Sequence, residues 1–385
     1  MTGMAALIVF AVWLYLTIAR GAFWLVTTRD NGPVPRPQEW PSLVAIVPAR
    51  DEADCVRESI SSLLQQSYPG RLSIILVDDQ SRDQTVATAL DISQKLASAH
   101  GFEIYRGGIL RAGWTGKLWA LQQGIDRVER TVQPPVYFLL TDADIVYAPG
   151  TLLSLVSRAQ AEGLVLTSLM AKLRCESFAE HALLPAFVFF FRMLYPFSWV
   201  RDPKRITAAA AGGCVLVRRD ALSMAGGIAA IREALIDDCA LAQKLKSCGP
   251  ISLELSDRVH SIRAYPEIGD IRRMVARSAY AQLGYSPVLL IGTVIGMAAI
   301  FLAPALFALL GSGLAQIFGI ASWFLMAIIF QPMLRFYQRS PLWGAAFPLI
   351  ALVYVAFTLD SAYQYAMGRG GSWKGRNQAN ASQLR

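Results

Sequence analysis

Apolar residues form two long blocks near the ends of the chain and short runs between them. Residues 4–26 are long enough to cross a bilayer, and no charged residue occurs from Ser278 to Leu334. The second block accommodates two helices of about 20 residues, with a turn at Gly311–Gly313, and a third span is predicted over Pro341–Leu359. We therefore predict a transmembrane anchor in residues 1–28 and transmembrane helices in residues 278–366.

Between these blocks, strand-like runs alternate with helical stretches. The runs SLVAIVPA, LSIILVDD and VYFLLTDAD are followed by helical patterns at Val56–Gln66, Thr85–Ala97 and Thr151–Ala161. This alternation is typical of a parallel α/β sheet, in which ligands bind at the carboxyl ends of the strands. Residues 42–277 are therefore predicted to form an α/β domain, preceded by a proline-rich linker (29–41) and followed by a basic tail (367–385).

Basic residues indicate the orientation in the membrane. Arg20 and Arg29 lie on the domain side of the first apolar block, so the positive-inside rule predicts a cytoplasmic domain on the cell (inner) membrane. A cleaved signal peptide is disfavoured, because no basic segment precedes the block and no clear cleavage site ends it. One span before the domain and three after it would put the basic tail outside, so one segment is expected to be re-entrant or interfacial.

Composition supports membrane association and excludes several classes of protein. The 385 residues are 54% hydrophobic with a mean hydropathy of +0.39, and the formal net charge is +8. With spans present, this charge favours lipid headgroups or phosphorylated substrates over nucleic acid. The five cysteines include no CxxC pair, and HExxH and GxSxG motifs are missing. Disulfide frameworks, zinc sites and serine hydrolases are therefore disfavoured.

A second aromatic stretch is harder to interpret. His181–Val200 is apolar but is interrupted by Pro185, Arg192 and Pro196. Such a segment is either a contact with the membrane surface or the acceptor, or part of a buried core. The sequence leaves both interpretations open.

Acidic pairs follow the predicted strands. Asp142 and Asp144 end VYFLLTDAD, where alternate carboxylates can hold a divalent cation and its diphosphate ligand; Mg²⁺ or Mn²⁺ prefers such hard oxygen ligands. The alternative is a simple polar turn. Asp78 and Asp79 end the preceding strand, where a carboxylate can bind a nucleobase or ribose or cap a helix. Glu52 follows the first strand and is expected at the same edge.

Another acidic pair and a lysine complete the candidate chemistry. Asp238, beside Asp237, is the candidate base for an acceptor hydroxyl, although two aspartates that merely open a helix are the plain alternative. Lys117 lies in GWTGK before a helix, where it can hold phosphate oxygens. The basic segments Ile271–Arg277 and GRGGSWKGR either neutralise a leaving diphosphate or grip anionic headgroups.

Taken in order, PARDE, VDDQSRD, GWTGK, TDAD, GGCVLVRRD and IDDCAL resemble the family 2 glycosyltransferases of the GT-A fold. With the apolar ends and the WKGR tail, the pattern looks most like the hopene-associated glycosyltransferases of HpnB type. The resemblance implies a Rossmann-like GT-A domain, a metal-dependent and inverting reaction, and Asp238 as base beside Asp237. It also implies that Glu52 and Asp79 contact the nucleoside of a nucleotide-sugar donor, such as a UDP-sugar, and that Asp142 and Asp144 hold nucleotide and metal. Together with these, the predicted donor-binding residues are Pro48, Asp78, Lys117 and Arg277.

The sequence therefore predicts transfer of a sugar to a lipid acceptor. The resemblance suggests a hopanoid as one such acceptor. A polymerising synthase is disfavoured, because no QxxRW motif follows Asp238. One alternative keeps the fold but uses a polyprenyl phosphate as acceptor, which needs no strong base. The other is a non-catalytic membrane protein that binds nucleotides, whose spans would be expected to carry polar residues.

Overall fold

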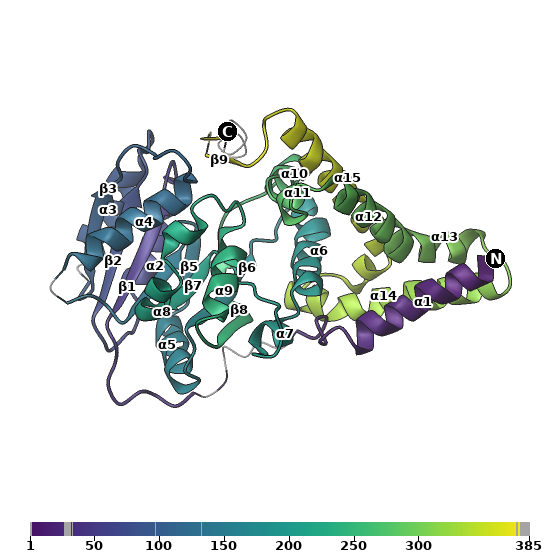
Figure 1. Ribbon diagram of the computed structural model, residues 1–385, viewed down its shortest axis with the longest axis horizontal. Coiled ribbons are helices and arrows are strands. Elements are labelled where there is room, and N and C mark those ends of the chain that lie inside the picture. The colour runs from purple at the N-terminus through teal and green to yellow at the C-terminus, as the bar shows by residue number, and fades with distance from the viewer. Residues whose placement is uncertain are drawn as a thin grey trace. The chain divides into compact units, whose positions relative to one another are not determined.

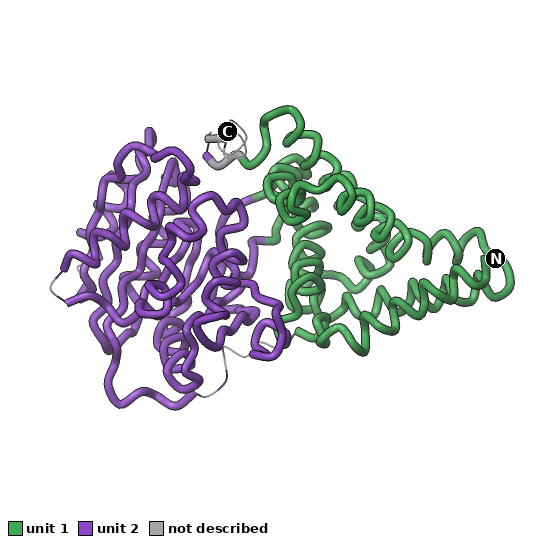
Figure 2. The backbone as a smooth tube through the Cα atoms, viewed as in Figure 1, with its two compact units in different colours: residues 1–26, 175–198, 265–372 green, residues 27–174, 199–264, 373–385 purple. Residues whose placement is uncertain are grey.

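The computed structural model describes residues 2–26, 32, 34–96, 98–131, 133–374 and 376–377. It divides into two compact units (Figure 2). The sheet unit comprises Thr27–Arg174, Trp199–Ala264 and Trp373–Arg385, and the helical unit comprises Met1–Val26, Cys175–Ser198 and Tyr265–Ser372. Each unit therefore joins segments that lie far apart in the sequence. Arg29 and the end of the basic tail, residues 378–385, lie outside the described residues.

The sheet unit is built on an eight-stranded sheet with the order β3-β2-β1-β4-β7-β6-β8-β5 (Figure 1). Its parallel part consists of β3 (Gly101–Arg106), β2 (Leu72–Asp78), β1 (Leu43–Ala49) and β4 (Tyr137–Thr141). β7 (Cys214–Arg218) runs antiparallel to β4 and β6 (Leu166–Leu173), β8 (Ile251–Ser261) is parallel to β6, and β5 (Ile145–Tyr147) is antiparallel to β8. The mixed α/β, Rossmann-like arrangement predicted from the sequence is confirmed.

The predicted helices of this unit are present. The first ends two residues earlier than predicted, the last has the predicted bounds, and Ala97, the predicted end of the other, lies outside the described residues. These helices are α2 (Val56–Leu64), α3 (Thr85–Leu96) and α5 (Thr151–Ala161). The remaining helices of the unit are α4 (Gly116–Glu129), α8 (Arg219–Met224), η1 (Ile228–Ile231) and α9 (Asp237–Lys246), and α7 (Phe197–Arg201) begins in the helical unit and ends in this one.

The register brings the polar strand ends to one edge of the sheet. Ala49 of β1 pairs with Asp78 of β2, and Thr141, the last residue of β4, pairs with Cys214, the first residue of β7. All residues of β1 and β4 are buried, so each strand stays apolar until it reaches this edge. Buried parallel strands carry such continuous apolar runs. The residues that follow β1, β2 and β4, and those that precede β7, are therefore neighbours.

A glycine sets how closely α4 approaches the sheet. A Cβ atom at Gly124 would lie 2.6 Å from Cγ2 of Ile46 in β1 and 2.9 Å from Cγ2 of Val77 in β2. Real Cβ atoms do not approach so closely, so a larger residue here would push the helix away from the sheet. The first turn of α4 carries Lys117, and the close packing at Gly124 fixes its height above the sheet edge.

The helical unit contains the apolar ends of the chain. Its elements are α1 (Thr2–Ile18), α6 (Phe178–Leu194), α10 (Ile268–Ala276), α11 (Ala279–Gln282), α12 (Pro287–Met297), the π-helical η2 (Ala298–Leu302), α13 (Ala303–Leu310), α14 (Leu314–Phe336), η3 (Pro341–Gly344) and α15 (Phe347–Ala366). Within the described residues, three helical stretches are long and apolar enough to cross a membrane: Pro287–Leu310, Leu314–Phe336 and Phe347–Ala366. The predicted turn at Gly311–Gly313 separates the first two, whereas α1 is shorter than the predicted anchor.

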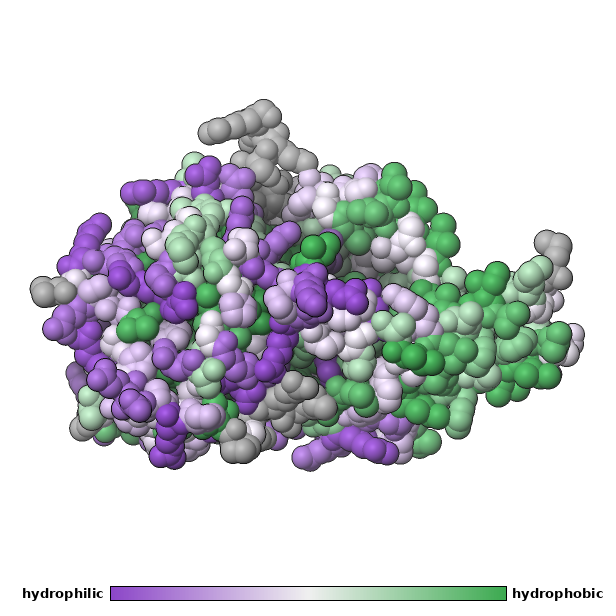
Figure 3. Space-filling view, turned by 60° about the horizontal axis from the view of Figure 1, so that its bottom comes forward, coloured by the Kyte–Doolittle hydropathy of each residue, from purple (hydrophilic) through white to green (hydrophobic). Residues whose placement is uncertain are grey.

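Exposed apolar side chains gather on the part of the helical unit formed by α1, α13 and α14 (Figure 3). They include Leu7, Ile8, Leu306, Leu309, Leu314, Ile317 and Phe324. These helices also pack against one another. An exposed apolar surface of this kind marks a contact with lipid or another apolar partner.

The aromatic stretch His181–Val200 falls mainly in α6, which contains Pro185. Ser177 and Glu180 form a capping box at its start. Near its other end, Phe189 is 1% exposed, and its ring packs against Phe330 and Phe347. This part of α6 is core of the helical unit, which agrees with the second of the two interpretations left open by the sequence.

Candidate active site

The ends of β1 and β2 form the first part of the site. Pro48 lies inside β1, and the backbone N–H of Glu52 donates to Thr85 Oγ1 (2.8 Å) at the start of α3. Asp78 ends β2, and its Oδ1 accepts a hydrogen bond from the Ser81 backbone (3.1 Å), which shapes the following loop. Asp79 is fully buried and forms an ion pair with Arg50, whose Nη1 lies 3.8 Å from Asp79 Oδ2.

Arg263 connects the end of β1 with the acidic pair that follows β4. Its Nη2 donates to both carboxylate oxygens of Glu52 (2.8 and 2.7 Å), and its Nε donates to Asp144 Oδ2 (2.9 Å). Ser261, the last residue of β8, donates its hydroxyl to the same oxygen of Asp144 (3.2 Å). The carboxylate of Asp144 is therefore fixed in direction by two donors.

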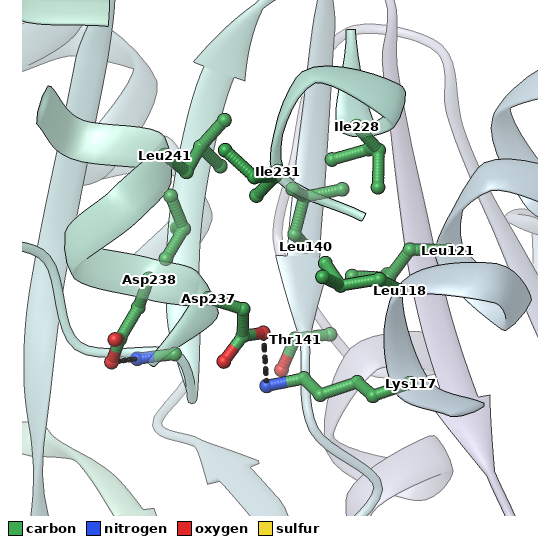
Figure 4. Close-up of a pocket in the computed structure, with 12 residues that line it drawn as sticks. Lys117, Leu118, Leu121, Leu140, Thr141, Ile228, Ile231, Asp237, Asp238 and Leu241 are labelled. Atoms are coloured by element: carbon green, nitrogen blue, oxygen red, sulfur yellow. Dashed lines mark hydrogen bonds and ion pairs between the residues drawn. The ribbon is translucent and has the colours of Figure 1, made fainter. Parts of the chain in front are cut away.

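Lys117 connects the two acidic pairs, and Figure 4 shows its contact with Asp237. Thr115 caps α4 through its side chain, which places Lys117 in the first turn of the helix. The ammonium of Lys117 lies 2.9 Å from Asp142 Oδ1 and 3.1 Å from Asp237 Oδ2. Burial alone would lower the pKa of Lys117, but the carboxylates of Asp142 and Asp237 outweigh it and raise the pKa above its usual value. This lysine is therefore a permanent cation.

Asp238 is held by backbone groups. Asp237 and Asp238 open α9, and Asp238 Oδ2 accepts from the N–H of Gly212 (2.9 Å), while Oδ1 accepts from the N–H of Cys239 (2.7 Å). Burial and the neighbouring charge of Asp237 raise the pKa of Asp238 to about 6, against the opposing effects of Lys117 and the two N–H donors. A carboxylate with this pKa is ionised at neutral pH but is a better proton acceptor than an ordinary aspartate.

A small apolar cavity of about 20 Å³ lies behind Lys117, Asp237 and Asp238. Leucine and isoleucine account for half of its lining residues: Leu118, Leu121, Leu140, Ile228, Ile231 and Leu241 (Figure 4). A cavity of this size holds about one water molecule. These apolar walls lower the local polarity around the two acidic residues, which agrees with the raised pKa of Asp238.

The residues fit a divalent cation. In the sheet unit, this edge carries five carboxylates and three cationic side chains, an excess of two negative charges. The carboxylates are Glu52, Asp142, Asp144, Asp237 and Asp238, and the cations are Lys117, Arg263 and Lys374. A nucleoside diphosphate brings further negative charge, which a divalent cation would compensate. Among the described residues, no group of three or more His, Cys, Asp or Glu is arranged to hold a metal ion, so the candidate ligands are the two carboxylates of Asp142 and Asp144. Mg²⁺ commonly needs just one or two carboxylates, with phosphates and water as the other ligands.

Most of the predicted site residues lie at this edge of the sheet unit, and one of them, Arg277, belongs to the helical unit instead. Glu52, Lys117, Asp142, Asp144, Asp237 and Asp238 are joined by the contacts above, and Pro48, Asp78 and Asp79 lie at the ends of β1 and β2. Arg277 caps the end of α10 and belongs to the helical unit. Its predicted role in donor binding stays a prediction.

Sequence reasoning missed several groups that organise the edge. Arg50 and Arg263 pair with predicted carboxylates, and Gly212 holds Asp238. Arg263 lies two residues after the end of β8, just as the acidic residues follow earlier strands. Its position after a strand was the feature of the sequence that could have identified it. Lys374 was noted as part of a basic tail; its ammonium lies 3.0 Å from Glu52 Oε1.

Comparisons with known proteins agree with this fold. Residues 44–224 match the model of glycosyl transferase family 2. The mannosyltransferase PcManGT from Pyrobaculum calidifontis, solved with GDP-Man and Mn²⁺, is 16% identical, with a TM-score of 0.57 over 94% of this chain and 99% of its own. S. aureus TarS with UDP-GlcNAc is 14% identical, with a TM-score of 0.40 over 85% and 92%. No curated protein matches the sequence.

The matched residues include the ends of β1, β2 and β4 together with Lys117 and the beginning of β7. The predicted GT-A fold is confirmed by the shared architecture. Residues 44–224 are therefore similar to glycosyl transferase family 2, and the chain contains a mixed α/β, Rossmann-like domain of the GT-A fold.

Proposed function

We propose that the protein is an inverting glycosyltransferase that moves a sugar from a nucleotide-diphosphate sugar to the hydroxyl of a lipid at the cytoplasmic face of the cell membrane. The observation that carries the proposal is the position of Lys117. Its ammonium contacts one carboxylate of each acidic pair, 2.9 Å from Asp142 and 3.1 Å from Asp237. The candidate cation ligand Asp142 and Asp237, the neighbour of the candidate base Asp238, therefore contact the same positive charge.

Asp238 is the base in this mechanism. The hydroxyl oxygen of the acceptor attacks the anomeric carbon as the bond from that carbon to the donor phosphate oxygen breaks. The hydroxyl proton passes to the Asp238 carboxylate, and the bonding electrons leave with the nucleoside diphosphate. The N–H groups of Gly212 and Cys239 hold both oxygens of Asp238, so the carboxylate is oriented before the acceptor binds.

The leaving diphosphate is stabilised by positive charge. Asp142 and Asp144 would hold Mg²⁺ or Mn²⁺, which when bound supplies charge compensation for the phosphate oxygens. Lys117 can donate to these oxygens after exchanging its contact with Asp142, since an ammonium has three donors. Arg263 orients the Asp144 carboxylate through its hydrogen bond to Oδ2. The hydrogen bonds that orient Asp144 are already present, so within this group of residues Lys117 is the one that exchanges a partner.

The donor is proposed to be a nucleotide sugar bound at the ends of β1 and β2. Glu52 and Asp79 are buried there, and Asp78 shapes the adjoining loop. The presence of GDP-Man and Mn²⁺ in PcManGT, which has the same fold, supports this class of donor and a divalent cation. A UDP-sugar remains the donor implied by the sequence resemblance.

A lipid acceptor is proposed because the chain carries long apolar helices. Three stretches of the described residues are able to span a membrane by length and composition. A membrane-bound enzyme of this kind meets lipid hydroxyls directly at the bilayer surface. A hopanoid is one acceptor of this class, suggested by the resemblance of the motifs and the WKGR tail.

The test uses membranes that contain the full-length protein. Wild type, Asp144→Asn and Asp238→Asn are incubated with labelled UDP- and GDP-sugars and either Mg²⁺ or Mn²⁺, and label is followed into the lipid extract. Asp91→Asn is a matched control, because Asp91 lies on α3 in an exposed pair with Arg57 and Lys95. Label in lipid with wild type and the control, and its loss in the two site variants, is the expected result.

Other outcomes point elsewhere. Equal labelling by all four proteins would show that the assigned cation ligand and base are wrong. Retained labelling by Asp238→Asn with loss in Asp144→Asn would indicate a polyprenyl phosphate acceptor, whose phosphate oxygen needs no strong base. Binding of donor without transfer to any lipid or soluble acceptor would indicate a non-catalytic nucleotide-binding protein.

A further inference from the structure

One of the backbone groups that hold Asp238 belongs to a tight turn, residues 211–214, which leads into β7. The N–H of Cys214 donates to the carbonyl of Ala211 (3.2 Å) and closes this turn. Inside it, the N–H of Gly212 donates to Asp238 Oδ2 (2.9 Å). A hydrogen bond weakens steeply when its angle is distorted, so the orientation of Asp238 depends on how the 211–214 turn is held.

Two buried hydroxyl groups hold the middle of the 211–214 turn. The hydroxyl of Thr141, the last residue of β4, donates to the carbonyl of Gly213 (2.8 Å), and Thr141 also lines the cavity behind Lys117 (Figure 4). Tyr147 in β5 donates its own hydroxyl to Thr141 Oγ1 (2.7 Å). Burial raises the pKa of Tyr147 well above its usual value, so the phenol keeps the proton that it donates. In a buried chain of this kind, each hydrogen bond strengthens the next.

Ser168 of β6 holds the two ends of the 211–214 turn. Its Oγ accepts a hydrogen bond from the N–H of Ala211 (2.9 Å), and its hydroxyl donates to the carbonyl of Cys214 (3.0 Å). Buried backbone groups outside regular elements need partners of this kind. The turn is thus fixed at both ends as well as in its middle, so the N–H of its second residue has a defined direction.

The 211–214 turn also packs on the segment that carries the first acidic pair. Thr141 directly precedes Asp142 in the sequence. A Cβ atom at Gly213 would lie 2.7 Å from Cδ1 of Ile145, the residue that follows Asp144, so glycine permits this close approach. The turn therefore contacts residues on both sides of the first acidic pair while it holds a residue of the second.

We propose that Thr141 and Tyr147 are positioning residues for sugar transfer: their hydroxyls hold the 211–214 turn so that the N–H of Gly212 orients the carboxylate of Asp238. The inference rests on the proposed function, in which Asp238 is the base. A base must point at the acceptor hydroxyl, and small misplacements of a reacting group are costly in rate. Both residues act through the turn, and neither is assigned a contact with substrate.

The test compares variants of the full-length protein in membranes. Thr141→Val keeps the branched shape of the side chain but removes its hydroxyl, and Tyr147→Phe keeps the ring. Thr141→Ser keeps the hydroxyl and is the conservative variant. Thr151→Val and Tyr68→Phe are matched controls, because these two buried residues of the sheet unit also donate their hydroxyls to backbone carbonyls.

Steady-state kinetics and pH profiles give the first measurement. Thr141→Val should lower turnover about tenfold, less than the loss of the base itself, with little change in the KM of the donor. The N–H of Gly212 lowers the pKa of Asp238, so weakening this bond should move the acidic limb of the pH profile to higher pH. Tyr147→Phe should act in the same direction by about threefold, because the Thr141 hydroxyl can still donate to the turn. Thr141→Ser should recover most of the turnover.

Amide hydrogen exchange, followed by mass spectrometry, measures the turn itself. In Thr141→Val, the peptide that contains residues 211–214 should exchange about 3- to 10-fold faster than in the wild type, the factor that corresponds to the loss of one hydrogen bond. The two control variants should leave the exchange of this peptide and the acidic limb of the pH profile unchanged. A general loss of stability would instead speed exchange throughout the sheet unit.

Two results would overturn the inference. One is a fall in turnover in Thr141→Val with unchanged exchange and an unmoved acidic limb, because the loss would then arise without the turn. The other is wild-type turnover in both Thr141→Val and Tyr147→Phe. If Thr141→Val does not accumulate in membranes, Tyr147→Phe decides by the same measurements: faster exchange of the turn with a moved limb supports the inference, and no change in either overturns it.

Hydrogen exchange does not depend on sugar transfer, so failure of the inference and failure of the proposed function are distinguishable. Faster exchange of the turn in Thr141→Val, with no transfer by the wild type to any acceptor, would support the link between the hydroxyls and the turn but remove the proposed function. Transfer by the wild type, with unchanged exchange and pH limb in the variants, would remove the inference and leave the proposed function standing.

Discussion

The two acidic pairs of the site share Lys117 but differ in their other partners. Asp144, in the pair that follows β4, accepts hydrogen bonds from the guanidinium of Arg263 and from Ser261. Asp238, in the pair that opens α9, accepts from backbone N–H groups, and burial raises its pKa to about 6. Similar side chains are thereby suited to different tasks. The first pair contacts the cationic side chains of Lys117 and Arg263 and suits a divalent cation, whereas Asp238 of the second pair suits the acceptance of a proton.

The largest effect is expected at the first pair. Asp144→Asn should lower sugar transfer by about 10³-fold or more, because a bound cation stabilises transition-state charge by several kcal/mol and each tenfold corresponds to about 1.4 kcal/mol. Transfer rates at increasing Mn²⁺ measure this, with Asp91→Asn as control. If Asp144→Asn keeps wild-type activity in the presence of a chelator, the first acidic pair does not act through a bound cation.

The next largest effect is expected at the second pair. Asp238→Asn should lower the turnover rate by about 10²-fold or more, the usual contribution of a positioned base. The KM of the donor should change little, because Asp238 is assigned to the acceptor side. Steady-state kinetics separate the two constants. A large rise in donor KM with unchanged turnover would assign Asp238 to donor binding instead.

Lys117→Met tests the link between the pairs. Methionine keeps most of the volume but removes the charge, and hydrogen bonds to charged groups are worth about 1.5–3 kcal/mol, so transfer should fall about 10- to 100-fold. Lys117 also lowers the pKa of Asp238, so its loss should move the acidic limb of the pH profile to higher pH. A fall in rate with an unmoved limb would show that Lys117 serves the first pair alone.

The pH dependence of the wild type should reflect Asp238. A base must be ionised, so turnover should be full well above pH 6 and should fall below it, by about tenfold at pH 5. The limb is measured with the pH profile of turnover at saturating donor and acceptor. Asp238→Asn should lack this limb. If the variant retains it, another group controls the reaction below pH 6.

The smallest effect is expected at Lys374. Its side chain is 24% exposed, and partly exposed ion pairs contribute about 0.2–1 kcal/mol, so Lys374→Ala should raise the donor KM by at most about fivefold. Lys374→Arg keeps the charge and should stay near wild type. Equilibrium binding of UDP and GDP measures the effect. A loss as large as that of Asp144→Asn would make the tail part of the catalytic machinery.

The sequence predicted the parallel half of the sheet and most of the acidic edge. Strands such as Leu43–Ala49 are continuous apolar runs that end in polar residues, and this pattern depends on local sequence alone. Arg263 was missed because its pair with Glu52 joins residues 211 positions apart, which no local period reveals. The grouping of residues 175–198 and 265–277 with the membrane helices was missed for the same reason. It depends on tertiary packing such as that of Phe189 on Phe347.

The contact between the tail and the first strand also governs when the site is complete. Lys374 and Asp51 are 323 positions apart, so at a synthesis rate of about 5–20 residues per second the tail emerges roughly 16 to 65 s after the strand that it joins. During that time Glu52 is already made, and the three long apolar helices are made before the tail. We therefore expect a nascent chain to complete these helices first and to close the edge of the sheet last.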